Sequence, residues 1–486
     1  MVKKFNKWNI LKILYVIAAF AFALPSYIYL IKNKSVYNLD IDYSFLINNE
    51  EKVKQTLIYV GIIIFIVILY FLILKFRKKL FKNIKSVLIF ITIISLIFIF
   101  TVPMFSFDIF YYMGIGRLNS EYGQNPYYIS MQEFVENNEN INLALDTTLY
   151  RGYTNAWASE TVVYGPIWTI ICALLSKITF GNVDLCLFVF KLVNILVHIV
   201  NCYLIYKISK KKLFTLIYGL NPFILIQTIV DVHNDIFMVL FILLSLYELL
   251  KKKNIWLAVL FLAIATCIKY FAVLLLPFVI IYHFRKEKTS VKILKCIQYG
   301  LLFLMIILIP YMFYIRDLSV FSGMITQQSK YSKSIGVIIF KYFPGQQKII
   351  KDLLYFFIYC FAIKNMLLLL KPKIKIRKEL NHLFYFVFIF LFVLITNFQP
   401  WYILWLFPLV MWQKPKFIRL MIQISVIVLF DYIIFMIYED SWQIGANFAL
   451  ILLGTIIFFY LINNIKGLRR YIKRRKKEKY ESTCSR

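Results

Sequence analysis

The chain has 486 residues, of which 61% are hydrophobic and only 16% charged, and its formal net charge is +32. Apolar runs of about 20 residues recur from end to end, so the solvent of this protein is the bilayer. This composition excludes a cytosolic enzyme, a disordered protein and a secreted disulfide scaffold. The basic residues lie in short loops between apolar segments, where they indicate membrane topology and not nucleic-acid binding.

We expect an all-α fold, a polytopic transmembrane helical bundle of about 12–14 hydrophobic segments. The segments lie near 11–32, 56–75, 87–103, 163–180, 184–206, 213–230, 235–250, 255–283, 291–313, 351–370, 380–397, 399–413, 417–438 and 446–463. The first is too long for most signal-peptide cores, so it is expected to be an uncleaved anchor. We expect residues 1–465 to form one integral membrane domain and residues 466–486 a basic cytoplasmic tail.

The loops predict the orientation. Residues 75–85 carry six basic residues and no acid, which favours the cytoplasm, as does the basic tail. Residues 104–162 carry seven acids against two arginines and form the longest non-membrane piece, so they are expected to be the main external loop. We therefore expect a multi-pass plasma-membrane protein whose two termini are cytoplasmic.

The segments between 163 and 283 do not fit a simple count. If each crosses once, the basic residues at 207–212 and 251–254 lie outside, against the positive-inside tendency. The preferred alternative makes 255–283 two short helices that meet near Lys269. One of 163–180 and 184–206 then fails to span, which is tolerated where a helix is buried in protein or lines a cavity.

The first chemical candidate is Asp108, which follows the 87–103 segment where the chain leaves the bilayer. A carboxylate there is within reach of a lipid headgroup, although a solvated helix-end aspartate explains it equally well. Tyr112, Gly116 and Arg117 suggest a short amphipathic helix on the membrane surface. Arg117 can face a phosphate or be an interfacial side chain that extends toward water. A turn follows at residues 125–127.

The second candidate is the cluster of Asp231, His233, Asn234 and Asp235 between two apolar segments. The residue types suit a metal, but the spacing is not a specific signature. A helix cap by Asn234 or Asp235 is the structural alternative. Three ionisable residues exceed what a cap needs, so we favour a functional role.

Lys269 lies inside an apolar stretch, where an ammonium costs about 2.5–3.5 kcal/mol. It is therefore expected to face a polar cavity or a partner. Binding of an anionic headgroup is preferred over a structural ion pair. Lys191, Asn194, His198 and Asn201 share one helix face, and interhelical hydrogen bonding is the preferred explanation for that face.

Trp401 and its neighbour Tyr402 open a short segment near 399–413. Aromatic residues at this depth often form an interfacial belt, and they can also stack on a sugar ring. Both interpretations stay open from the residues alone.

An ordered set of motifs runs from about residue 87 to 413. It comprises Asp108, Gly116-Arg117, Asn125-Pro126-Tyr127, Tyr164-Gly165-Pro166, Asn221-Pro222, His233-Asn234-Asp235, Lys269 with Pro277, and Pro400-Trp401-Tyr402. This order resembles the GT-C superfamily of integral-membrane glycosyltransferases, closest to its polyprenyl-phosphate-mannose-dependent mannosyltransferases. Asp108 has no adjacent second acid, so the use of a divalent metal stays open and no cofactor is firmly expected.

The resemblance implies that Asp108 is catalytic, that the chemistry takes place on the external face, and that the donor is a sugar on a polyprenyl phosphate. Such a phosphate is already a competent leaving group, so a single base replaces the two carboxylates of most glycosidases. We expect Asp108 to deprotonate the acceptor hydroxyl, with inversion. Donor-phosphate binding is assigned to Lys269, Arg117 and His233. The supporting or groove-lining residues are expected to be Asn234, Asp235, Tyr112, Asn125, Tyr127, Tyr164 and Trp401.

The expected partners are the polyprenyl-phosphate sugar donor, a glycan, lipid or protein acceptor, and membrane lipids. Mannose follows from analogy alone. A polytopic transporter or a lipid-linked sugar flippase is the main alternative, because intramembrane Lys, His and Asp also line substrate pathways. A polysaccharide ligase with a different lipid donor is the other. The absence of an internal sequence repeat favours the transferase over a transporter.

Overall fold

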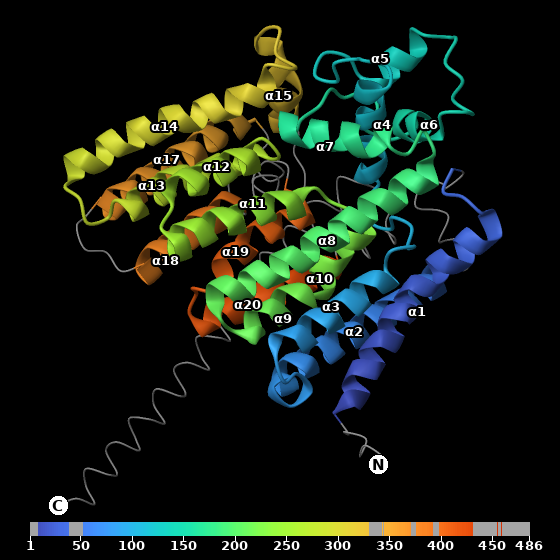
Figure 1. The fold of residues 1–486 in the computed structure, drawn as a ribbon, viewed down its shortest axis with the longest axis horizontal. Coiled ribbons are helices and arrows are strands. Elements are labelled where there is room, and N and C mark those ends of the chain that lie inside the picture. The colour runs from blue at the N-terminus through green and yellow to red at the C-terminus, as the bar shows by residue number, and fades with distance from the viewer. Residues whose placement is uncertain are drawn as a thin grey trace, which may run out of the picture.

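The computed structural model describes residues 8–37, 52–329, 343, 345–370, 376–391, 398–430, 454 and 458. Every regular element in these ranges is a helix, which confirms the predicted all-α bundle (Figure 1). Four of these helices are long and apolar enough to cross a membrane. They are α1 (Asn9–Asn33), residues Leu57–Leu80 of α2 (Lys52–Leu80), α8 (Val183–Ser209) and α14 (Thr289–Tyr311). A pair bent by 52° adds a fifth if its two parts are counted as one span.

After α3 (Ile84–Ile97), the long loop contains three helices and leads into a fourth. These are α4 (Asp108–Ser120), α5 (Met131–Glu136), α6 (Thr147–Tyr153) and α7 (Pro166–Lys177). The predicted position of α4 on the membrane surface is wrong, because α4 is buried at every position from 108 to 118. Glycines permit this enclosure. A Cβ on Gly114 would lie 2.7 Å from the Cα of Gly152, and one on Gly116 would collide with the carbonyl oxygen of Cys172 in α7.

The polar face of α8 makes buried hydrogen bonds to the helices that follow it. Lys191 and Asn194 donate to backbone carbonyls at residues 228–230, and Asn201 donates to the carbonyl of Ile236. His198 lies 3.1 Å from the carbonyl of Gly219. These contacts confirm interhelical bonding as the role of this face. The elements contacted belong to α9 (Lys212–Gly219), α10 (Pro222–Leu225), the π-helix η2 (Ile226–Val230) and α11 (Asp235–Tyr247).

The segment near 255–283 is broken at Lys269, as predicted. Its elements are α12 (Ile255–Thr266), the 3₁₀ helix η4 (Tyr270–Leu275) and α13 (Leu276–His283), and η3 (Glu248–Lys252) precedes them. The 12-residue helix α7 is about 18 Å long, too short to span a bilayer. Of the two predicted segments between 163 and 206, α8 alone is long and apolar enough to span.

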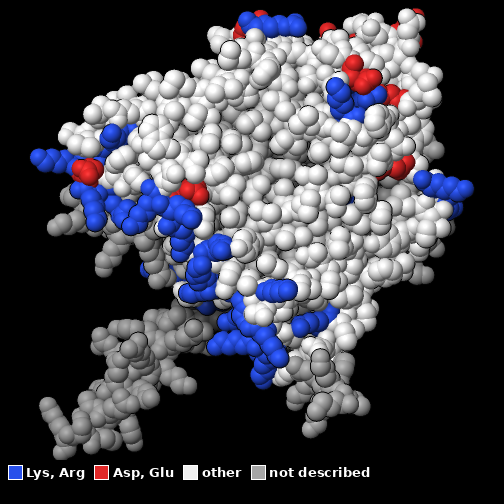
Figure 2. Space-filling model, viewed as in Figure 1, with Lys and Arg blue, Asp and Glu red and all other residues white. Residues whose placement is uncertain are grey.

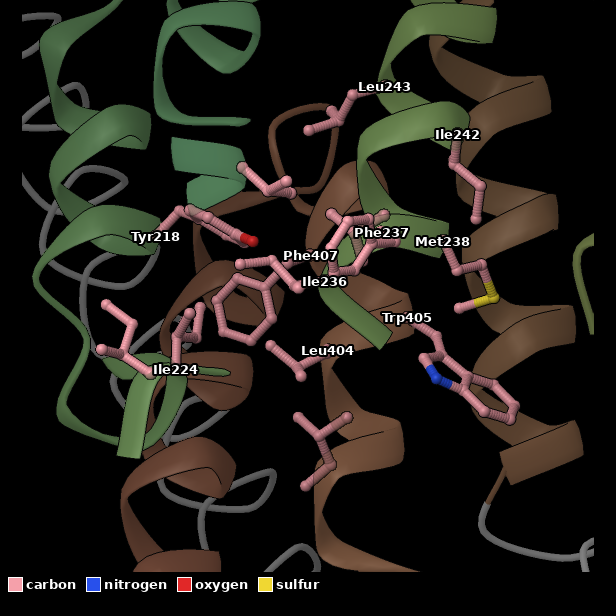
Figure 3. Close-up of a cluster of buried hydrophobic side chains, with 14 of the residues drawn as sticks. Tyr218, Ile224, Ile236, Phe237, Met238, Ile242, Leu243, Leu404, Trp405 and Phe407 are labelled. Carbon is pink, nitrogen blue, oxygen red and sulfur yellow. The ribbon is translucent and has the colours of Figure 1, made fainter. Parts of the chain in front are cut away.

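The second half of the chain packs its short helices against the first half. The described elements are η5 (Leu318–Phe321), α15 (Ser322–Ser329), α17 (Gln347–Leu370), α18 (Ile376–Ile389), η7 (Pro400–Leu406), α19 (Phe407–Val410), α20 (Pro415–Ile427) and η8 (Val428–Phe430). Figure 3 shows Ile236 and Phe237 of α11 in one core with Leu404, Trp405 and Phe407. This core holds residues 400–407 against the start of α11. Most of the predicted segment 446–463, parts of 380–397 and 417–438, and the tail 466–486 lie outside the described residues.

Candidate active site

Asp108 is the first residue of α4 and is almost enclosed by protein. The indole Nε1 of Trp157 donates to its Oδ1 over 3.1 Å, and the hydroxyl of Tyr112 lies 3.5 Å from its Oδ2. Burial raises the pKa of Asp108 to about 6, while the Trp157 hydrogen bond and the charge of Lys269 act in the opposite direction. A carboxyl group with this pKa can exchange a proton near neutral pH, as a general base must.

A tight turn at residues 231–235 faces Asp108. The carboxylate Oδ1 of Asp231 accepts hydrogen bonds from the backbone N–H groups of Met104 and Phe105, at 3.0 and 3.1 Å. It thereby fixes the chain just ahead of Asp108. Val232 has φ +59, a left-handed conformation that costs a β-branched residue on the order of 1–2 kcal/mol. Strain of this kind persists only where the surrounding contacts hold it, and it is typical of functional sites.

His233 lies between Asp108 and an aromatic ring. Its Nδ1 is 3.7 Å from the Oδ2 of Asp108, and its ring stacks on Trp401 with centroids 3.8 Å apart. Burial, followed by the charge of Lys269, lowers the pKa of His233 well below its usual value, so its ring is neutral at pH 7. It therefore offers hydrogen bonds and not a positive charge.

Neither ring nitrogen of His233 and neither amide atom of Asn234 has a hydrogen-bond partner among the described residues, although both side chains are fully buried. Asn234 occupies the N-cap position of α11 but makes no side-chain cap bond. The capping alternative is therefore wrong for Asn234. Buried polar groups are normally hydrogen-bonded, so this pair is suited to a polar ligand.

Lys269 lies in extended backbone between α12 and η4. Its Nζ is 2.8 Å from the Oδ1 of Asp235, which also accepts a hydrogen bond from the indole of Trp405. The ammonium lies 4.7 Å from the ring centroid of Tyr402 and 5.3 Å from that of Trp405. Aromatic faces and one carboxylate thus compensate this buried cation.

The start of α7 fixes the break that presents Lys269. The backbone N–H groups of Gly165 and Ile167 donate to the carbonyls of Ile268 and Cys267, at 3.3 and 3.0 Å. Gly165 is required for this approach, because a Cβ there would collide with the Cys267 carbonyl. The free N–H groups at a helix start and the unpaired carbonyls at a helix break therefore satisfy each other.

Of the other residues predicted to line the groove, two tyrosines lie close to Asp108 and two side chains lie farther from it. The hydroxyl of Tyr164 is 3.3 Å from that of Tyr112, so both tyrosines reach the neighbourhood of Asp108. Tyr127 lies behind them and donates to the Tyr164 carbonyl over 2.8 Å. Asn125 donates to the backbone carbonyl of Tyr314 over 2.7 Å. The last two side chains therefore support the wall of the site from outside.

Arg117 lies nine residues along α4 from Asp108. Its guanidinium pairs with Asp146 at 2.6 Å and with Glu121 at 3.1 Å. The structure does not bring Arg117 to Asp108, because these two carboxylates hold it at the other end of the helix. Arg117 therefore does not belong to the site around Asp108.

The structure thus gathers Asp108, His233, Asn234, Asp235 and Lys269, and we call these five residues the polar cluster. The side chains of Asp108 and Lys269 are each 12% exposed, whereas those of His233 and Asp235 are fully buried. The base candidate and the cation are therefore the reachable ionised groups of the cluster. Across the described ranges, no group of three or more His, Cys, Asp or Glu side chains is arranged to hold a metal ion.

Sequence reasoning missed the contacts that Trp157 and Trp405 make to this cluster, and the backbone-binding role of Asp231. Trp157 lies in the polar loop with no pattern around it, and only its tertiary contact with Asp108 reveals it. In the sequence, Asp231 cannot be told apart from the other polar residues of the turn. Only the structure shows that its carboxylate binds backbone N–H groups and not the cluster. Trp405 comes from a segment 170 residues away from the carboxylate that it contacts.

The described part of the chain is thus an all-α bundle with apolar helices long enough to span a membrane, and it gathers a carboxylate, a lysine and aromatic rings at one site. Residues 16–285 match the family described as alpha-(1→6)-mannopyranosyltransferase, N-terminal domain. The match covers more than half of the chain, so the chain belongs to this family of membrane mannosyltransferases. It confirms the resemblance drawn from the motifs. No curated protein and no solved structure gives a match.

Proposed function

We propose that the protein transfers mannose from a polyprenyl-phosphate donor to a glycan acceptor on the extracytoplasmic side, with inversion at the anomeric carbon. The single observation that carries the proposal is the polar cluster, in which a carboxylate and an ammonium are both partly exposed and a neutral histidine lies 3.7 Å from the carboxylate. The family supplies mannosyl transfer. The lipid-linked donor is supported by the chemistry that these residues can perform.

The reaction needs one base and one anion site. The acceptor oxygen attacks the anomeric carbon, its proton passes to Asp108, and the bond from that carbon to the phosphate oxygen breaks. The departing phosphate takes the electron pair of this bond and needs no proton from the enzyme. Direct displacement from the face opposite the leaving group inverts the configuration.

Lys269 and His233 are suited to the developing charge on the phosphate. Lys269 provides the positive charge, and the ring nitrogens of His233 together with the Asn234 amide provide uncommitted hydrogen-bonding atoms. Groups already held in place stabilise a transition state without reorganisation at the moment of reaction. Asp235 orients the lysine, and Trp401 orients the imidazole by stacking on it.

The distribution of charge supports an external site. Lys and Arg side chains gather along the lower left edge of the molecule (Figure 2). This edge contains the α2–α3, α8–α9, η3–α12 and α13–α14 connections, and helices α4–α7 lie away from it at the upper right (Figure 1). Basic connections favour the cytoplasmic side, which supports an extracytoplasmic position for α4–α7 and for Asp108 at the start of α4.

The test is transfer by the purified full-length protein in liposomes supplied with radiolabelled polyprenyl-phosphate mannose and a glycan acceptor. We expect Asp108→Asn to lower the rate at least about a hundredfold. Asp184→Asn is the matched control, because that carboxylate only anchors residues 35 and 36 and should leave the rate near normal. In the unsubstituted protein the rate should fall below about pH 6, where Asp108 becomes protonated.

Near-normal transfer by Asp108→Asn would remove its role as the base. Transfer from a nucleotide sugar in place of the lipid donor would overturn the proposed donor. Movement of the lipid-linked sugar across the bilayer without its cleavage would identify a flippase.

A further inference from the structure

Residues 155–157 hold the chain around Asp108 in place, in addition to the hydrogen bonds that Asp231 makes to the backbone of Met104 and Phe105. The Asn155 amide, which is buried, donates to the backbone carbonyl of Phe107 over 2.8 Å. The Asn155 side-chain oxygen accepts from the backbone N–H of Trp157 over 3.0 Å, which fixes the start of this turn. The Trp157 indole then reaches Oδ1 of Asp108. Two side chains of one turn thus hold two successive residues.

This contact makes the two oxygens of Asp108 unequal. Oδ1 accepts the indole hydrogen bond at 3.1 Å. Oδ2 faces the hydroxyl of Tyr112 at 3.5 Å and Nδ1 of His233 at 3.7 Å, both longer than the preferred hydrogen-bond distance. Oδ2 thereby faces His233, a member of the polar cluster. It is therefore the oxygen with spare acceptor capacity on the reacting side.

We propose that Trp157 is a positioning residue of the transfer reaction: its indole N–H holds Oδ1 of Asp108 so that Oδ2 takes the proton from the acceptor hydroxyl. The inference rests on the proposed function, in which Asp108 is the base. The acceptor O–H bond breaks as the O–C bond forms, and the proton is held on Oδ2 until product release. Trp157 itself exchanges no proton, because an indole N–H only donates a hydrogen bond.

Trp157→Phe isolates the hydrogen bond, because it keeps an aromatic ring at the position and removes the N–H. An N–H donor stabilises the ionised carboxylate, so its loss makes Asp108 harder to ionise. We expect the acidic limb of the pH–rate profile to move to higher pH by about one unit and kcat at the optimum to fall roughly tenfold, with little change in the KM for the donor. A ring that only stacked on substrate would give a changed KM and an unmoved limb.

The experiment compares full pH–rate profiles of the full-length protein and its variants in liposomes. Trp157→His, which keeps a ring N–H donor, should return the limb toward its original position. Trp256→Phe is the matched control, because Trp256 is 61% exposed on α12 and lies outside the cluster. In an Asp108→Asn background, Trp157→Phe should have no further effect on the residual rate.

The inference would be overturned if the acidic limb of the pH–rate profile stayed in place in Trp157→Phe. It would also be overturned if that limb lay at the same pH in the Trp157→Phe and Trp157→His variants. Either result would leave the proposed function intact. Failure of the unsubstituted protein to use polyprenyl-phosphate mannose would instead overturn the proposed function.

Discussion

At the scale of single residues, the proposed role of Lys269 in phosphate binding depends on whether its buried ion pair has a purely structural function. Lys269 and Asp235 lie 2.8 Å apart, and such a pair can be purely structural. The exposed fractions of the two side chains favour a binding role for the lysine, because a ligand can reach Lys269 and cannot reach Asp235. Removal of either partner alone leaves an uncompensated buried charge, so a single substitution cannot separate the two roles.

The two roles are separated by a pair of variants. Lys269→Met should destabilise the protein by about 3–5 kcal/mol and abolish transfer, because Asp235 loses its cation. Lys269→Met combined with Asp235→Asn should recover most of the stability and still fail to transfer, because the phosphate has no cation. Thermal unfolding in detergent and donor-dependent transfer measure the two effects. A double variant with normal transfer would show that the pair is structural only.

At the scale of elements, the position of Lys269 depends on one close approach between helices. The start of α7 touches the break between α12 and η4 through Gly165, with backbone hydrogen bonds on both sides of the contact. The interior of a packed protein does not absorb an added methyl group without movement. A methyl group at Gly165 would therefore displace the backbone at Cys267 and Ile268, directly ahead of Lys269.

Gly165→Ala should destabilise the protein by about 1–3 kcal/mol and lower transfer from the lipid donor. Gly300→Ala is the matched control, because Gly300 lies in α14 with nothing within 4 Å of a Cβ. This control should be neutral or stabilising by about 0.5–1 kcal/mol, with unchanged transfer. Thermal unfolding and initial rates of both variants test the contact. Equal behaviour of the two would mean that α7 does not set the position of the lysine.

At the scale of the whole molecule, the basic edge and the long loop predict opposite sides of the membrane. Glu139 and Lys252 are exposed markers of the two regions. In Glu139→Cys an impermeant thiol reagent should label intact cells, and in Lys252→Cys it should label only permeabilised cells. The unsubstituted protein, with its own cysteines, sets the background of each assay. The reverse pattern would place the polar cluster in the cytoplasm.

The sequence predicted the features that leave a local pattern. Apolar runs predicted the helices, and the basic loops at 207–212 and 251–254 predicted the break near Lys269. The burial of α4 could not be predicted, because it depends on glycine contacts with α6 and α7, which are far away in the chain. The phosphate-binding prediction for Arg117 also failed because of a distant contact. Its partner, Asp146, lies 29 residues away, and no local pattern indicates that ion pair. Trp157 reveals its role only through a contact across 49 residues.

The enclosure of α4 has a consequence for how specificity can vary. Asp108 begins a helix that cannot shift without moving α6 and α7. In the proposed reaction, donor and acceptor therefore come to a carboxylate that stays in place. The rings that pack on His233 and Lys269, namely Trp401, Tyr402 and Trp405, belong to residues 400–406, beyond the segment matched by the family. Substitutions in η7 would therefore change which sugar or acceptor fits while the proton acceptor stays where it is.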